Sequence, residues 1–228
     1  MDGICLHDDN GCDDASGTTI QMTAQIPDFV WFEGHRYRLA GVSGRGLFDP
    51  HDVGLRPAAT STANLRGFHC TYGVEDSRLV LQTVYIGLAE PTELFGHLPE
   101  RGGITEFAPN SWAFKSLDRP IRFTGGILLG DGLTGRPSRH IGTPPPWTYA
   151  TLLELEFHGG GLTAMTDHSA SASRFRATVD QSGLAPSLRR LVSRDAPLDA
   201  ESWPERVRAW MDETFAHDYN PTDPLSGR

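Results

Sequence analysis

The stretch GFHCTYGVEDSRLVLQTVYIGL, residues 67–88, decides the fold class of this chain. Its first half alternates apolar residues with polar residues or glycine, which is the period of two that a strand requires. Those apolar positions are Phe68, Cys70, Tyr72 and Val74. Residues 75–77 form the turn, and a second strand continues to residue 88. Its alternation slips by one residue after Leu81, which predicts a β-bulge at residues 82–83.

Two other segments predict β-hairpins. Residues 28–39 place a Glu33-Gly34 turn between two short apolar runs, and residues 149–167 place the glycine-rich turn 158–161 between two alternating runs. In the first hairpin the predicted pairs are Phe32 with His35, Val30 with Tyr37, Trp31 with Arg36 and Phe29 with Arg38. In the second, Leu162 and Ala164 are expected to face Phe157 and Leu155.

The segments between these hairpins are less regular. Residues 41–57 are rich in Gly, Pro and Asp and predict a loop, which should pack on the domain because it carries four apolar residues. These are Leu47, Phe48, Val53 and Leu55. Residues 121–129 predict a strand interrupted at Gly125-Gly126, and residues 130–147 predict a long loop.

The last part of the chain predicts helix. Ser202-Trp-Pro-Glu205 has the pattern of a capping box, and a shorter helix is expected over residues 185–192. The residues after the box define one apolar stripe at helical spacing. They are Trp203, Val207, Trp210, Met211, Thr214 and Phe215. The predicted fold is therefore mainly β (α+β), an antiparallel sandwich or a partly closed barrel with a C-terminal amphipathic helix.

Length and composition fit one domain. The chain has 228 residues with 25 Gly and 16 Pro, which suits many short strands joined by turns. We expect a single globular domain over residues 21–216, a disordered acidic tail over residues 1–20 and a flexible tail over residues 217–228.

Charge and cysteine content limit the class of protein. The formal net charge is −9, which argues against general affinity for nucleic acid, although it describes only the average surface. Three cysteines do not form a disulfide framework, and neither a signal peptide nor an apolar membrane span is recognisable. The expected location is the cytoplasm, with no membrane partner.

The segment around the first strand pair also resembles a family. Residues 62–72, TANLRGFHCTY, follow the pattern Thr-Ala-x-x-Arg-Gly-aromatic-x-x-x-Tyr, and the preceding LFDPHDVGLRP and the later LLELEF extend the similarity to about half of the chain. The pattern resembles an uncharacterised family of small bacterial β-rich proteins. That resemblance implies one β-rich bacterial domain and no settled activity or catalytic residues.

No standard catalytic or cofactor motif is present. GVSGRG, residues 41–46, lacks the Lys-Ser/Thr ending of a phosphate-binding loop, and the chain has no Gly-x-Ser-x-Gly and no Cys-x-x-Cys. The N-terminal Cys, His and Asp residues (Cys5, His7, Asp8, Cys12 and Asp13) have donors for a soft metal. A spacing of this kind seldom places four ligands around one metal ion, so we expect no metal and no cofactor.

The best candidate site lies at Asp49-Pro-His-Asp52 together with the first long strand. The candidate catalytic residues are Asp49, His51 and His69, because an Asp and a His close together can act as general base and acid. The candidate ligand-binding residues are Arg66, Asp52 and Tyr72, with Arg66 suited to an anion. A purely structural reading is favoured, in which Asp49-Pro50 starts a turn and Arg66 ties the loop to the sheet.

A second group of titratable residues lies on the late hairpin. Glu154 and Glu156 share one strand face near Asp167 and His168, and paired carboxylates can serve hydrolysis. A solvated outer face of the sheet explains them more simply.

Two functions follow from these observations. The favoured one is a non-enzymatic interaction or accessory protein, for example an immunity-like factor, that binds one macromolecular partner. The net charge suggests a basic protein, because charge steers association. The alternative is a small-molecule enzyme or ligand-binding β-barrel that uses the His/Asp/Arg cluster. Neither the oligomeric state nor the identity of a partner follows from the sequence.

Overall fold

The fold is taken from a computed structural model, which describes residues 25–102, 111–134, 144–181 and 205–219. The predicted tail over residues 1–20, the predicted helix over residues 185–192 and the capping serine at 202 lie outside the described residues.

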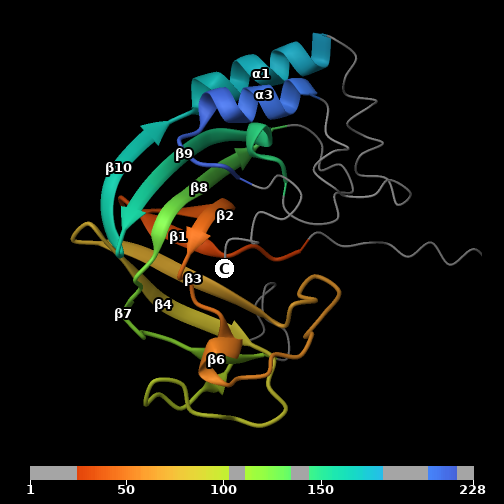
Figure 1. Cartoon of the computed structure of the whole chain (residues 1–228). Coiled ribbons are helices and arrows are strands. Elements are labelled where there is room, and N and C mark those ends of the chain that lie inside the picture. The colour runs from red at the N-terminus through yellow and green to blue at the C-terminus, as the bar shows by residue number, and fades with distance from the viewer. Residues whose placement is uncertain (1–24, 103–110, 135–143, 182–204, 220–228) are drawn as a thin grey trace, which may run out of the picture.

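The chain forms a seven-stranded closed barrel with a short side extension (Figure 1). The barrel order is β10–β9–β8–β2–β1–β3–β4, and the pairing of Gly161 with Arg78 joins β10 back to β4. All these pairings are antiparallel except β1 with β3. The strands are β1 (Phe29–Phe32), β2 (His35–Arg45), β3 (Phe68–Glu75), β4 (Arg78–Ile86), β8 (Thr124–Leu133), β9 (Tyr149–His158) and β10 (Gly161–Asp167).

The remaining elements are short or lie outside the barrel. The side extension on β4 consists of β6 (Trp112–Phe114), β5 (Glu100–Arg101) and β7 (Arg119–Pro120). Two 3-10 helices, η1 (Pro50–Val53) and η2 (Pro146–Thr148), lie in the connections. The α-helices are α1 (Ser169–Gln181) and α3 (Glu205–Thr214). Within the described residues, no helix is long and apolar enough to cross a membrane.

The predicted mainly β fold is confirmed, and so is the pairing of the first hairpin. Its four predicted residue pairs are the four observed pairs between β1 and β2. The bulge is also confirmed, because Thr71 pairs with Thr83 and Tyr72 with Leu81, which leaves Gln82 as the extra residue of β4. These features followed from alternation and turn chemistry, which act over a few residues.

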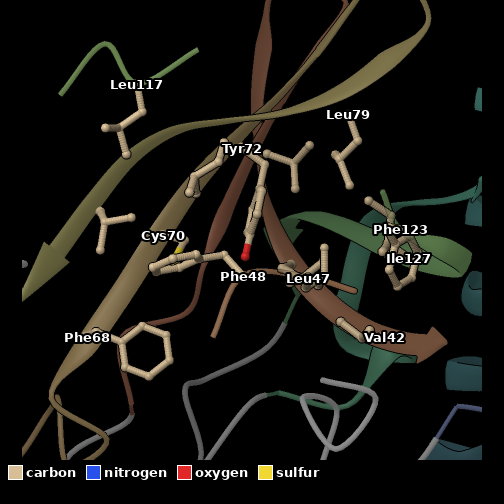
Figure 2. Packing of buried hydrophobic residues seen from close by; sticks show 14 of the residues in the cluster. Val42, Leu47, Phe48, Phe68, Cys70, Tyr72, Leu79, Leu117, Phe123 and Ile127 are labelled. Carbon is tan, nitrogen blue, oxygen red and sulfur yellow. The ribbon is translucent and has the colours of Figure 1, made fainter. Parts of the chain in front are cut away.

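The barrel interior is filled by one cluster of buried apolar side chains from six of the seven barrel strands, and the partly buried Leu162 of β10 packs against it. Tyr72, Phe114 and Phe123 are among its largest fully buried members. Leu47, Phe48 and Leu55 also join this cluster, as predicted for the loop after β2, whereas Val53 remains 41% exposed. Figure 2 shows Leu47 and Phe48 among the side chains of this cluster.

A second apolar cluster lies outside the barrel, between the β8–β9 wall and the two α-helices. Figure 1 shows α1 and α3 side by side on this part of the barrel. The predicted apolar stripe is confirmed for Val207, Met211 and Phe215, which are buried, and Trp210 packs against the cluster. The described helix begins at Glu205, so Trp203 lies outside the described residues.

Several predicted local features are wrong. The segment 41–57 is only partly loop, because β2 continues to Arg45 and η1 forms at Pro50. Helix α1 is absent from the sequence prediction, since its polar sequence SASASRFRATVDQ lacks a strong apolar period. A bulge between Leu162 and Ala164 pairs Ala164 with Glu156 rather than with Leu155.

Strand β8 runs without interruption through Gly125-Gly126, where the sequence predicts a break. Gly125 has a φ of +137°, and a Cβ placed on it would lie 2.0 Å from the backbone oxygen of Ser43 on β2. The opposite residue, Gly44, has a φ of +135°. Two glycines facing each other thus allow β2 and β8 to approach closely at this level of the barrel.

Replacing Gly125 by Ala should therefore destabilise the barrel by about 3 kcal/mol, because the new methyl group meets backbone and the conformation is unfavourable for any residue with a Cβ. Gly159→Ala is the matched control, since Gly159 also has a positive φ but open space around it. Its expected cost is about 1 kcal/mol. Urea denaturation measures both variants, and equal losses would contradict the close-approach explanation.

Candidate functional site

Asp49 and His51 form a local pair in the connection after β2. The Asp49 carboxylate accepts a hydrogen bond of 2.8 Å from the His51 backbone N–H and so caps η1. The same oxygen lies 2.7 Å from Nδ1 of the His51 ring. Asp52 is exposed in the same turn. This is the turn predicted by the structural reading, with an Asp–His pair that faces solvent.

Arg66 is tied to the barrel by a buried carboxylate that the sequence analysis missed. Asp28 is fully buried just before β1, and its Oδ1 accepts hydrogen bonds from Arg66 Nη2 and from the backbone N–H of Cys70 at 2.8 Å. Arg66 Nε donates to the Phe68 carbonyl at 2.7 Å, and its guanidinium lies over the Phe68 ring. The arginine therefore anchors the segment before β3 to the start of β1.

His69 is buried on the outer side of β3, opposite the inward Phe68 and Cys70. Its ring stacks on Tyr85, the cross-strand neighbour on β4, with ring centroids 4.8 Å apart. Among the residues that the structure describes, none forms a hydrogen bond with His69 Nδ1. Burial, with a smaller contribution from the positive charge of Arg66, lowers the pKa of His69 to about 4. At neutral pH the imidazole is therefore uncharged.

This burial predicts a pH effect on stability. The folded-state pKa of His69 is about 4, below the ordinary value of 6.5, so the unfolded chain binds the proton more readily and stability falls as the pH drops from 6.5 towards 4. The loss between pH 7 and pH 5 should be about 2 kcal/mol. His69→Phe keeps an aromatic ring against Tyr85 and should remove this loss in urea denaturation. An unchanged loss in that variant would contradict the assignment.

Tyr72 lies inside the barrel, on the opposite side of the β3 wall from His69. Figure 2 shows its hydroxyl pointing towards Phe48, in the apolar cluster that also contains Cys70. Burial raises the pKa of Tyr72 well above its ordinary value, and burial also raises the pKa of Cys70 to about 12. Both groups are therefore neutral core residues rather than a ligand-binding surface.

The structure thus brings the predicted site residues into one region without joining them into one site. Burial lowers the pKa of Arg66, Asp49 is close enough to oppose that shift slightly, and the charge of Arg66 contributes to the lowered pKa of His69. However, the Asp49–His51 pair faces solvent, Arg66 binds Asp28, and the His69 ring is buried against Tyr85.

The structure also contains a buried polar network around Glu154, which the sequence did not predict. Glu154 is 1% exposed, so its interpretation as part of a solvated face is wrong. Its carboxylate lies 2.9 Å from His168 Nε2 and accepts hydrogen bonds from the Tyr219 hydroxyl at 2.9 Å and the Ala216 backbone N–H. Glu156 is partly exposed and lies 3.3 Å from His217.

This network holds the end of the described chain against the barrel. Burial by itself raises the pKa of Glu154, but the hydrogen bonds from His168, Ala216 and Tyr219 outweigh it and leave the pKa below its ordinary value. Tyr219 is buried, although its sequence position suggested a flexible tail. The carboxylate is thus an ionised anchor for the segment that follows α3, fully occupied by protein donors.

Comparison with known proteins gives no match. No family model, no curated protein and no solved structure matches this chain. The resemblance of residues 62–72 to a bacterial family therefore stays a prediction. Among the described residues, no group of three or more His, Cys, Asp or Glu side chains has the arrangement of a metal site.

The outer face of the β1–β2 hairpin is partly exposed, unlike these buried sites. Trp31 is 43% exposed there, next to its cross-strand partner Arg36. The guanidinium carbons of Arg36 and Arg38 lie 4.6 and 5.9 Å from the centroid of the Phe29 ring. We call the side chains of Trp31, Arg36 and Arg38 the hairpin face. Exposed Trp and Arg side chains are the residue types most often found at binding hot spots.

Proposed function

We propose that this protein is a non-enzymatic interaction protein that binds one macromolecular partner through its outer surface. The single observation that carries this proposal is the filled barrel interior, in which buried apolar side chains from six of the seven barrel strands form one cluster, with the partly buried Leu162 of β10 packed against it. A barrel that stores or transforms a small molecule instead uses its interior as a cavity. The outer surface of the barrel is therefore the part that can bind other molecules.

The arrangement of the candidate catalytic residues also supports this proposal. An acid–base pair acts on a substrate only when both groups reach the same bound molecule. Asp49 and His51 meet each other in the η1 turn, whereas the His69 ring stacks on Tyr85. Each interaction has a structural role in capping or packing, so the alternative of a His/Asp/Arg enzyme gains no support from this geometry.

Native mass spectrometry of the protein isolated gently from its own host tests the proposal. We expect the mass of this chain plus a second protein, at defined stoichiometry. A chain that carries only a small non-covalent adduct would contradict the proposal and favour a ligand-binding function. The basic partner suggested by the net charge remains one identity that this measurement can reveal.

A further inference from the structure

We infer that the hairpin face is the docking surface for the partner and that it takes an acidic segment of a protein, with an apolar side chain set against Trp31. This inference rests on the interaction function proposed above and deepens it. It concerns the local charge of one surface, which can differ in sign from the net charge of the chain.

The first support is the difference in exposure between two aromatic residues on the same strand face. Phe29 and Trp31 both point outward from β1, but Phe29 is 6% exposed while Trp31 is 43% exposed. The arginines of β2 lie over Phe29 and leave the Trp31 indole open. A large aromatic ring thus remains partly in water beside two guanidinium groups.

The second support is the unbalanced charge of these arginines. Among the described residues, neither Arg36 nor Arg38 forms an ion pair with an acidic side chain. Three acids of neighbouring positions have other partners: Asp28 binds Arg66, Asp131 lies 3.0 Å from His35 Nε2, and the Glu75 carboxylate accepts a hydrogen bond from Gln82. Glu33 lies in the hairpin turn. Two like charges near one ring favour an added anion, because it relieves their repulsion.

The third feature is the border of the hairpin face, where each neighbouring strand carries a glycine. On β3, Gly73 pairs with Trp31. On β8, Gly130 pairs with Arg38, and the Tyr149 ring covers that glycine. The side chains of Gln82 and Glu75 lie over Gly73, so the hairpin face is bordered by these groups and by the Tyr149 ring.

These features favour carboxylates on a protein over a nucleic acid. A planar guanidinium binds a carboxylate through two parallel hydrogen bonds, and the indole of Trp31 offers an apolar contact beside it. The net charge of −9 on the whole chain repels a long polyanion. A short acidic segment is mainly attracted by the two nearby arginines, because more distant charges are screened.

The test uses a synthetic Glu-rich peptide with a central Leu, titrated into the full chain while NMR follows the indole N–H signals. We expect the Trp31 signal to move and the double variant R36E/R38E to bind at least about tenfold more weakly. The matched control R78E/R122E makes the same change of charge on exposed arginines elsewhere on the barrel. It should bind like the wild type.

Other outcomes overturn the inference. Equal binding of a Lys-rich peptide, an equal loss in R78E/R122E, or stronger binding of a single-stranded DNA oligonucleotide would each contradict an acidic protein segment as the occupant. If native mass spectrometry finds a protein complex that survives both W31A and R36E/R38E, the docking surface is wrong while the proposed function stands. If the peptide binds here but the host yields no complex, the proposed function is wrong instead.

Discussion

Asp28→Ala should destabilise the fold by about 3–5 kcal/mol, because it leaves the partly buried guanidinium of Arg66 without its carboxylate and the Cys70 N–H without its acceptor. The Asp28 side chain is fully buried, whereas that of Arg66 is 25% exposed. The change should lower the urea midpoint without altering the slope of the transition, since the surface exposed on unfolding stays nearly the same.

The matched control is Asp49→Ala, which removes a carboxylate that also pairs with a cationic or polar side chain but is 33% exposed. Its expected cost is about 1 kcal/mol, for the lost cap and a largely solvated pair. Adding Arg66→Met to the Asp28→Ala variant should recover part of the loss, because the unpaired charge is then gone. Similar losses in the Asp28 and Asp49 variants would contradict the anchoring role.

Glu154→Ala is the second large effect, also about 3–5 kcal/mol, because His168, Ala216 and Tyr219 all lose their buried acceptor. The loss should be concentrated at the end of the chain. Amide hydrogen exchange should therefore increase first over residues 205–219, before the barrel strands respond. Glu156→Ala, at a partly exposed carboxylate, is the control and should cost about 1 kcal/mol or less.

The Glu154 carboxylate also makes the stability of the fold depend on pH in the acidic range. Because the folded-state pKa of Glu154 lies below its ordinary value of 4.5, its contribution is present at neutral pH and is lost as the pH falls from about 4.5 through the lower folded-state value. Glu154→Gln should reduce this acid sensitivity while keeping the side-chain volume. Wild-type and variant curves that fall in parallel below pH 4.5 would contradict the assignment.

The sequence predicted those parts of the fold that depend on neighbouring residues. Alternation and a two-residue turn were enough to assign all four pairs of the β1–β2 hairpin and the bulge in β4. Closure of the barrel depends on pairing Gly161 with Arg78, which are far apart in the chain and carry no local signal. Helix α1 was missed because its stability comes from packing of Ala172 and Phe175 on the barrel rather than from its own sequence pattern.

The candidate site was less predictable because most of its contacts join residues that are far apart in the sequence. Asp49 and His51 are close in sequence, and their pair could be anticipated. The partners of Arg66 and Glu154 come from distant segments, Asp28 and Tyr219, and hydrogen bonding across such separations has no short-range pattern. A charged residue directly before an apolar strand, as at Asp28, was the one available signal of a buried anchor.

We propose that this chain works through a partner on its outer surface rather than through chemistry at the η1 turn. Native mass spectrometry of wild type and of the D49N/H51A double variant, both isolated from the host, tests this most directly. The account predicts the same mass for both, this chain with a second protein bound. A bare chain with a small-molecule adduct that disappears in D49N/H51A would contradict the account and make the Asp49–His51 pair the functional site.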